Sequence, residues 1–257
     1  MQDSVKVTFL ANAGVLLEYR GVKLLIDGIY DEQGHCFSNL SAEQWEDLKA
    51  GRGAFAQIDY LLFTHGHGDH FSPRRVLEYL EQQRPKAIFL PMRGSVELNL
   101  LRKKIEEEKI PCAVLDASTC KNVTFRPEAD IRIRVLPTRH LDRIYWDVPH
   151  FCYLLELGEK KLLFTADVDF TWESFPQLRD VKLDAVFVNP LLMHSKEGRK
   201  LLTEGALQAK QRIVYHIPFA GEDRMGIRAL AEQQLRGGKA ERERTIYLME
   251  AGQSCLL

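Results

Sequence analysis

Four polar residues lie within six positions directly after an apolar run, in the stretch LLFTHGHGDHFSP at residues 61–73. They are His65, His67, Asp69 and His70. Buried together without a common partner, three imidazoles and a carboxylate would leave several polar atoms unpaired, at a desolvation cost. A divalent metal ion would satisfy them, because neutral imidazole nitrogen and carboxylate oxygen are ligands of zinc-like ions. The glycines between them allow a tight backbone. The stretch therefore predicts a metal site.

The residues on either side of this cluster predict a strand that leads into the site and a helix that leads out of it. Residues 60–63 read YLLF, a short apolar run typical of a buried strand. Ser72 and Pro73 are typical of an N-cap and a first helical residue. We expect the positive N-terminal end of this helix to lie near the metal site, where it would favour an anion.

Length and composition limit the class of protein. With 257 residues, of which 45% are hydrophobic, the chain can bury a sizeable core, and we expect residues 1–257 to form one α/β domain. The formal net charge is -1 and the charges are interspersed, so a nucleic-acid partner is not expected. No signal peptide or transmembrane segment is evident, which predicts a cytoplasmic protein without membrane contact. A homo-oligomer remains open.

The cysteines also favour the cytoplasm, which is a reducing compartment. Their number is odd and they contain no CxxC pair, which suits reduced thiols better than a disulfide framework. We therefore predict five free thiols, at Cys36, Cys112, Cys120, Cys152 and Cys255.

The sequence contains two halves that resemble each other. VLLEYRGVKLLID at residues 15–27 and YLLELGEKKLLFTAD at 153–167 both predict hairpins that turn at a glycine and end in an aspartate. After each hairpin comes a predicted strand with an aspartate near its start, IDYLLFTH in the first half and LDAVFVNP in the second. The alternative is that apolar hairpins look alike by chance. If the halves are related, they predict two sheets face to face with helices outside and sites along one edge.

A coarse reading of the whole chain gives the elements of these halves. Ser41, with Gln44 three residues later, forms a capping box that starts the first helix. We expect a hairpin near residues 5–27, helices near 41–50, 72–83 and 94–108, strands near 58–63, 86–90, 130–136, 151–157, 161–165, 184–188 and 212–216, and a closing strand TIYLM.

Further metal ligands must come from other strand ends. His140 follows the strand IRIRVLPT, Asp167 ends KLLFTA, and His216 ends QRIVY. Each alone would more often be a capping or otherwise satisfied polar residue. Together with the cluster at residues 65–70, they predict a complete ligand set.

The ordered series resembles the metallo-β-lactamase-fold superfamily, whose motifs are a strand-end aspartate, HxHxDH, a later histidine, a bridging aspartate and a final histidine. The matching residues, which span nearly the whole chain, are Asp27, His65, His67, Asp69, His70, His140, Asp167 and His216. The resemblance implies an αββα sandwich of two similar halves. The opening VTFLANAGVLLEYRGVKLLID is most similar to the single-domain group of ascorbate-phosphate lactonases and small-molecule phosphodiesterases.

The resemblance also implies a role for each ligand. His65, His67 and His140 would bind one metal ion, the remaining ligands would bind a second, and Asp167 would bridge them. The second set is Asp69, His70 and His216. Asp27 would support the site from behind the ligands, or be a strand-end turn residue. Zinc is the first expectation for both ions, although manganese or iron could bind the same donors. Two departures from the family pattern are Ala166, where glycine is common, and Gly28, where proline is frequent.

These residues predict a metal-dependent hydrolase. A hydroxide shared by the two ions would attack a phosphodiester or a lactone or ester of a small, anionic substrate. Asp69 and Asp167 would take part in catalysis, with Asp69 also able to move a proton. His194 could donate a proton to the leaving group, although a surface histidine is the more common case. Alternatives are an RNA-processing nuclease of the same fold and a metal-containing module that binds a ligand without catalysis.

Several residues near the predicted ligands could contact substrate. Arg139 and Arg143 could clamp an anion and Tyr145 and Trp146 could form an apolar wall, unless they are solvated or packed elsewhere. The segment 31–40 could form part of the pocket rim. Within this segment, we interpret His35 and Cys36 as residues without a role in the site. Arg224 is a further candidate for anchoring a substrate.

Overall fold

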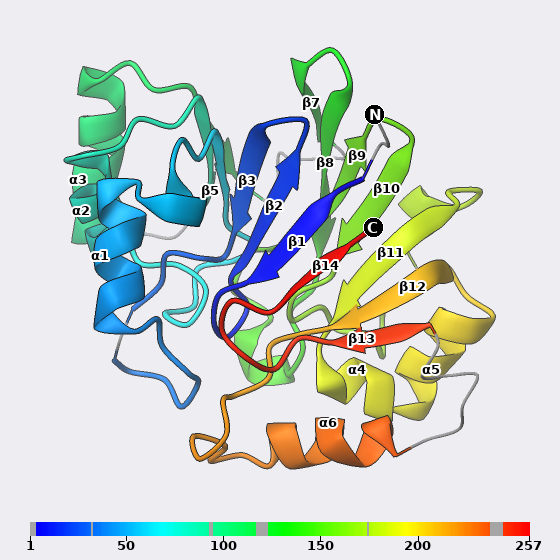
Figure 1. Cartoon of the computed structure of the whole chain (residues 1–257). Coiled ribbons are helices and arrows are strands. Elements are labelled where there is room, and N and C mark those ends of the chain that lie inside the picture. The colour runs from blue at the N-terminus through cyan, green and yellow to red at the C-terminus, as the bar shows by residue number, and fades with distance from the viewer. Residues whose placement is uncertain (1–3, 32, 93–94, 117–122, 174, 237–243) are drawn as a thin grey trace.

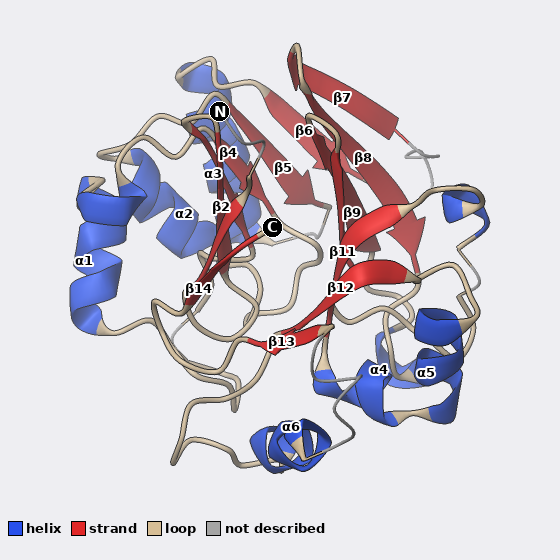
Figure 2. Cartoon of the chain, turned by 45° about the vertical axis from the view of Figure 1, so that its right-hand side comes forward, coloured by secondary structure: helices blue, strands red, loops and turns tan. Residues whose placement is uncertain are grey.

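Two seven-stranded sheets face each other, and helices cover the outer side of each (Figure 1, Figure 2). The computed structural model describes residues 4–31, 33–92, 95–116, 123–173, 175–236 and 244–257. The first sheet has the order β14 (Ser254–Leu256), β1 (Lys6–Phe9), β2 (Val15–Tyr19), β3 (Val22–Ile26), β4 (Tyr60–Leu62), β5 (Ala87–Pro91) and β6 (Cys112–Leu115). The second has the order β13 (Thr245–Tyr247), β12 (Ala209–Val214), β11 (Leu183–Val188), β10 (Lys160–Phe164), β9 (His150–Leu157), β8 (Ile131–Thr138) and β7 (Val123–Glu128).

The helices divide between the two outer faces. Figures 1 and 2 show the helices of the first half against one sheet and those of the second half against the other. The first set is α1 (Ala42–Ala50), α2 (Pro73–Leu80) and α3 (Val96–Glu107). The second set is α4 (Pro190–His194), α5 (Lys196–Thr203) and α6 (Ile227–Leu235). Short 3-10 turns are η1 (Gly53–Phe55), η2 (Arg143–Tyr145) and η3 (Pro176–Leu178).

Three apolar clusters hold the four layers together. The central cluster takes buried residues from both sheets, including Phe9, Tyr153 and Phe187. The second lies between the first sheet and α1 to α3, and the third between the second sheet and α4 to α6. Because each sheet packs on both faces, its central strands are buried at nearly every position, as in β9, where seven of eight residues are buried. The αββα sandwich is therefore confirmed.

The two halves repeat at the level of single hydrogen bonds. Each begins with antiparallel strands, β1 to β3 or β8 to β10, and continues with parallel ones. Asp59 precedes β4 and accepts from the backbone N–H of Lys23 at 2.8 Å. Asp184, in β11, accepts from the backbone N–H of Lys161 at 2.9 Å. The repeat predicted from the two hairpins thus extends to how neighbouring strands are pinned.

Most predicted elements are present, with three strands missing from the prediction. The capping box of Ser41 and Gln44 starts α1, and the Ser72 side chain caps α2. The edge strands β6 and β7 were not predicted. TIYLM contributes β13 to the second sheet, but it does not close the chain, because β14 follows and pairs with β1 in the first sheet.

The cysteines are free thiols where the structure describes them. Cys36, Cys112, Cys152 and Cys255 are unpaired as predicted, and Cys120 lies outside the described residues.

Within the described part of the chain, no helix combines the length and apolar character needed to cross a bilayer.

Candidate metal centre

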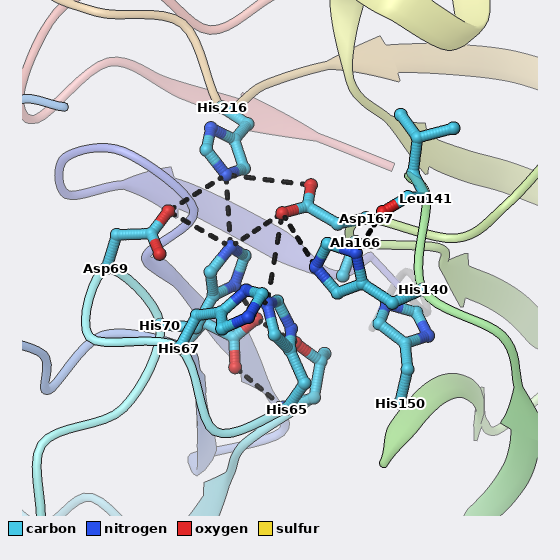
Figure 3. A network of polar contacts seen from close by, with 12 residues as sticks. His65, His67, Asp69, His70, His140, Leu141, His150, Ala166, Asp167 and His216 are labelled. Atoms are coloured by element: carbon cyan, nitrogen blue, oxygen red, sulfur yellow. Dashed lines mark hydrogen bonds and ion pairs between the residues drawn. The ribbon is translucent and has the colours of Figure 1, made fainter. Parts of the chain in front are cut away.

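The predicted ligands converge where strands of both sheets end at one edge of the sandwich (Figure 3). The HxHxDH stretch follows β4 of the first sheet. His140 follows β8, Asp167 follows β10 and His216 follows β12, all in the second sheet. Seven side chains fall into two groups, within each of which the potential ligand atoms lie within 4.8 Å of one another. The first group is His65, His67 and His140, and the second is Asp69, His70, Asp167 and His216.

In the first group, three imidazole nitrogens face a common point. Nε2 of His65 lies 3.1 Å from Nδ1 of His67. Nδ1 of His140 contacts the carbonyl oxygen of Leu141, which holds the proton on Nδ1 and leaves Nε2 as a lone-pair donor. That Nε2 is buried and has no hydrogen-bond partner.

In the second group, two imidazoles and two carboxylates meet. Nε2 of His70 lies 3.0 Å from Nε2 of His216. Oδ2 of Asp69 lies 3.5 Å from each of these two nitrogens. All four residues are largely buried, and the Asp69 and Asp167 side chains keep only 10% and 19% of their surface exposed, on the cavity side.

Asp167 stands between the two groups. Its Oδ2 lies 3.3 Å from Nε2 of His70, 3.8 Å from Nε2 of His140 and 3.9 Å from Nε2 of His65. Its Oδ1 lies 3.7 Å from Nε2 of His216. Figure 3 shows this carboxylate at the centre of the ring of histidines. This is the position that a bridging ligand requires.

The donor sets fit divalent metal ions. Two nitrogens that bind one tetrahedral zinc ion at about 2.05 Å lie roughly 3.3 Å apart, close to the spacing of His65 with His67 and of His70 with His216. The unpaired Nε2 of His140 costs free energy when buried without a partner, and a cation would supply one. Seven nitrogen and oxygen donors, without a thiolate, suit zinc, manganese or iron.

In the metal-free protein, the pKa values of the histidines differ between the two groups. Burial, together with neighbouring histidines, lowers the pKa of His67 to about 4 and that of His65 well below its usual value. Burial also acts to lower the pKa of His216, but the carboxylates of Asp167 and Asp69 outweigh it and raise the value to about 9. His65 and His67 are therefore neutral and ready to bind a cation, whereas His216 holds a proton that a cation must displace.

Residues behind the ligands fix their orientation. Asp27 accepts a hydrogen bond from Nδ1 of His70 at 2.8 Å, and two more from the hydroxyl and backbone N–H of Thr64 at 2.6 and 2.8 Å. Asp27 therefore occupies the supporting position that the family resemblance implies. Buried support of this kind sets the ring tautomer and raises metal affinity.

Two asparagines in this supporting layer were missed by sequence reasoning. Nδ2 of Asn12 donates to the carbonyl oxygen of Asp69 at 2.6 Å. Nδ2 of Asn189 donates to the carbonyl oxygen of Ala166 at 3.2 Å and lies 3.4 Å from Oδ1 of Asp167. Asn189 occupies the place in LDAVFVNP that Thr64 has in IDYLLFTH, so the internal repeat carried a signal for it.

His150 is another residue that the sequence analysis did not single out. It starts β9, is fully buried, and packs its ring 5.2 Å from that of His65 and 5.6 Å from that of His140. Its Nδ1 lies 2.7 Å from the hydroxyl of Thr138, and its Nε2 has no hydrogen-bond partner. His150 therefore packs against two ligand rings without lining the cavity itself.

The loops that carry His140 and Asp167 are tied to each other. The backbone N–H of Leu141 donates to the carbonyl oxygen of Asp167 at 2.6 Å. The Arg139 side chain donates to Oδ2 of Asp169 at 2.7 and 2.9 Å. Its guanidinium also lies 3.8 Å from the ring centroid of Trp146 and 4.4 Å from that of Trp172. Arg139 is therefore committed to this contact and is not the free anion clamp that we considered.

Three non-glycine residues at these strand ends have left-handed backbone conformations. The φ angles are 46° at Asp27, 45° at Ala166 and 61° at His216. This region costs an L-residue energy and is often found at functional sites, where the surroundings hold it. Ala166, the departure from the usual glycine, thus carries the loop before Asp167 despite its methyl group.

A cavity of about 570 Å³ opens over the metal centre. Among the ligands, His67, Asp69, His140, Asp167 and His216 line it. Residues 34–37 also line it, so the prediction that segment 31–40 contributes to the rim is confirmed, and His35 and Cys36 are part of the wall. A second cavity of about 850 Å³ shares His35, Cys36 and Phe37 and is also lined by Arg224.

His194 is not part of the centre. It is the exposed last residue of α4, and its carbonyl oxygen accepts from Arg199. The residues of α4 that line the cavity are Pro190 and Leu191. The hypothesis that His194 protonates a leaving group therefore lacks the required proximity.

Sequence comparison assigns the chain to a family. The family model described as "Beta-lactamase superfamily domain" matches residues 23–217, which include every ligand described above. The protein therefore belongs to this beta-lactamase superfamily. No curated protein sequence matches the chain.

Solved structures share the fold. The isothiocyanate hydrolase from Delia radicum gut bacteria is 16% identical, with a TM-score of 0.62 over 97% of this chain and 98% of that one. The short form of human tRNase Z is 13% identical, with a TM-score of 0.56 over 98% of each chain. CmlA, a diiron beta-hydroxylase from Streptomyces venezuelae, is 16% identical, with a TM-score of 0.59 over 100% of this chain and 54% of that one. At these identities the likeness shows the fold alone.

Proposed function

We propose that the protein is a hydrolase that holds two divalent metal ions and cleaves a carboxylic ester, a lactone or a phosphodiester of a small molecule. One observation carries this proposal. Two donor groups share the Asp167 carboxylate at the base of a cavity of about 570 Å³, large enough for a small substrate.

The metal ions would be held by His65, His67 and His140 on one side and by Asp69, His70 and His216 on the other, with Asp167 shared. When bound, two such ions lower the pKa of water and stabilise negative charge on the oxygen of a carbonyl or phosphoryl group. Zinc is our first choice for this histidine-rich set, with manganese and iron as alternatives.

Hydrogen bonds from the rest of the chain orient the metal-binding side chains. The Leu141 carbonyl holds Nδ1 of His140 and the Asp27 carboxylate holds Nδ1 of His70, so each ring presents Nε2 to the centre. Asn189 holds the loop of Asp167 through the Ala166 carbonyl. Preorganised donors lose little conformational freedom when a ligand arrives.

Asp69 is the residue best placed to move a proton. It lines the cavity, so its carboxylate is accessible to substrate and water. Burial acts to raise its pKa, but the charges of His70 and His216 outweigh burial and hold the pKa well below its usual value. Asp69 is therefore ionised at neutral pH, and a carboxylate oxygen there can accept a proton from water and return it to the leaving group.

The test is metal-dependent turnover. Protein reconstituted with zinc, manganese or iron should be assayed against carboxylic esters, lactones, phosphodiesters and a short RNA. We expect hydrolysis of a small ester, lactone or phosphodiester that is lost on chelation and in His140→Ala but kept in His194→Ala. Cleavage of RNA alone would instead support a nuclease. Two bound ions without turnover of any substrate would support a ligand-binding module and overturn the proposal.

A further inference from the structure

The wall of the cavity outside the metal centre is apolar. Its larger apolar residues are Phe37, Leu141, Tyr145, Pro190, Leu191, Met225 and Ile227. Three of them remain open to solvent, with exposed fractions of 39% for Tyr145, 40% for Leu191 and 52% for Met225. Large apolar side chains grouped at the mouth of a cavity indicate a surface that binds an apolar group.

The same wall lacks positive charge. Among the described residues that line the cavity, none is lysine or arginine, and Asp142 is the one acidic residue outside the metal ligands. Arg139 is paired with Asp169. Arg143, exposed in η2, does not reach the lining. Among the described residues of this lining, a substrate carboxylate or phosphate remote from the metal ions would therefore find no lysine or arginine to pair with, and would face Asp142.

The helix end expected to attract an anion already has a carboxylate beside it. The hydroxyl of Ser72, the N-cap of α2, donates to Oδ1 of Asp31 at 2.5 Å. Asp31 also lies 3.9 Å from the guanidinium of Arg74 in the first turn. The positive end of α2 is thus balanced within the protein and offers little to a substrate.

Tyr145 joins this wall to the metal ligands. Its ring centroid lies 4.6 Å from that of His67 and 5.2 Å from that of His140, in edge-to-face contacts. An apolar group lying against Tyr145 would therefore be held next to the reacting bond. Leu191 from α4 and Met225 from the segment before α6 continue the wall outward from the metal centre.

We propose that the substrate is uncharged outside its reacting bond, and that Tyr145, Leu191 and Met225 determine specificity by binding its apolar group. This inference rests on the hydrolytic function proposed above and specifies the class of substrate: a neutral ester or lactone with an apolar chain. The side chains act by covering apolar surface, so the ring of Tyr145 matters and its hydroxyl does not.

The test compares two esters of equal size and leaving group, the para-nitrophenyl esters of isooctanoic acid and of adipic acid. The second carries a carboxylate where the first carries an isopropyl group. With zinc-loaded protein, and with the metal-free rate subtracted, we expect kcat/KM to be at least about tenfold higher for the neutral ester. Equal or higher kcat/KM for the adipate ester would overturn the proposal.

Substitutions in the apolar wall test whether its side chains cause the preference for the neutral ester. Leu191→Ala should raise KM for the neutral ester by about fivefold with little change in kcat, since it removes uniform binding. Leu100→Ala is the matched control, because Leu100 is an exposed leucine of α3 and does not line the cavity. Tyr145→Phe should keep the preference and Tyr145→Ala should lose it. Leu191→Arg should shift the preference towards the adipate ester.

Binding calorimetry separates this inference from the hydrolytic function. The para-nitroanilides of the same two acids resist cleavage, and their affinities for zinc-loaded protein can be measured directly. If neither ester is cleaved but the neutral anilide binds about tenfold more tightly, carboxylic-ester hydrolysis fails and the apolar site stands. If neither anilide binds, or the charged one binds as tightly, the inference fails whatever the activity.

Discussion

The carboxylate of Asp27 accepts a hydrogen bond from Nδ1 of His70 at 2.8 Å, and neither residue has any solvent-exposed surface. The bond joins the end of β3 to a ligand in the loop after β4, so the ligand's orientation depends on the sheet. It also fixes which nitrogen of His70 is free for a metal ion.

Asp27→Asn should weaken metal binding without removing a ligand. The amide cannot accept from His70 and both Thr64 donors as the carboxylate does. We expect zinc affinity to fall by about 10-fold to 100-fold, measured by competition with a chromogenic chelator. Asp130→Asn changes a surface pair with Arg20 and serves as the control. Unchanged zinc affinity in Asp27→Asn would show that the bond does not support the ligand.

Arg139→Met should destabilise the fold rather than alter substrate charge preference. It leaves Asp169, which is 3% exposed, without its cationic partner. We expect a loss of about 3 kcal/mol in the free energy of unfolding, measured by denaturant titration. The matched change Arg20→Met breaks the exposed pair with Asp130 and should cost less than about 1 kcal/mol. Equal effects of the two changes would contradict the buried role of Arg139.

The metal-free protein should lose stability as pH rises above neutrality. Carboxylates raise the pKa of His216 to about 9 in the folded state, against an ordinary value of 6.5. A raised pKa contributes stability that is present below about pH 6.5 and is lost as pH passes 9. The melting temperature of chelator-treated protein should therefore fall between pH 7 and about 9.5, and His216→Gln should flatten the fall. A constant or rising melting temperature in the metal-free wild type would be inconsistent with protonated His216.

Ala166→Gly should be tolerated far better than an ordinary buried alanine-to-glycine change. At φ 45°, Ala166 carries a cost of about 1–2 kcal/mol that glycine would not, and this gain offsets the lost methyl contacts. The control Ala231→Gly, in the buried face of α6, should cost about 1 kcal/mol or more. Thermal unfolding compares them, and a larger loss for Ala166→Gly than for Ala231→Gly would refute the strain argument.

The sequence predicts the fold where periodicity and repeats are strong. The two hairpin patterns, and the two strands that follow them with an aspartate near their start, correctly indicated the face-to-face sheets. The strands β6, β7 and β14 were missed because they are edge strands of the two sheets, where a single partner and partial exposure weaken the apolar pattern. Their place depends on contacts across the sheet, which local sequence does not encode.

The site divides in the same way. Residue type and spacing were sufficient to select the seven donors that the structure brings together. The supporting residues Asn12 and His150 could not be selected, because their partners lie in other segments of the chain. For the same reason the sequence could not decide whether Arg139 is an anion clamp or a packed residue, since Asp169 and two tryptophans contact it only in the folded protein.

Metal stoichiometry tests the central claim, two ions held around Asp167, most directly. Protein reconstituted with zinc and freed of excess ion should be analysed by inductively coupled plasma mass spectrometry. The arrangement of the donors predicts about two zinc ions per chain in the wild type and in His194→Ala, and about one in His140→Ala, which leaves the second group intact. One ion or fewer per chain in correctly folded wild-type protein would contradict the dinuclear centre.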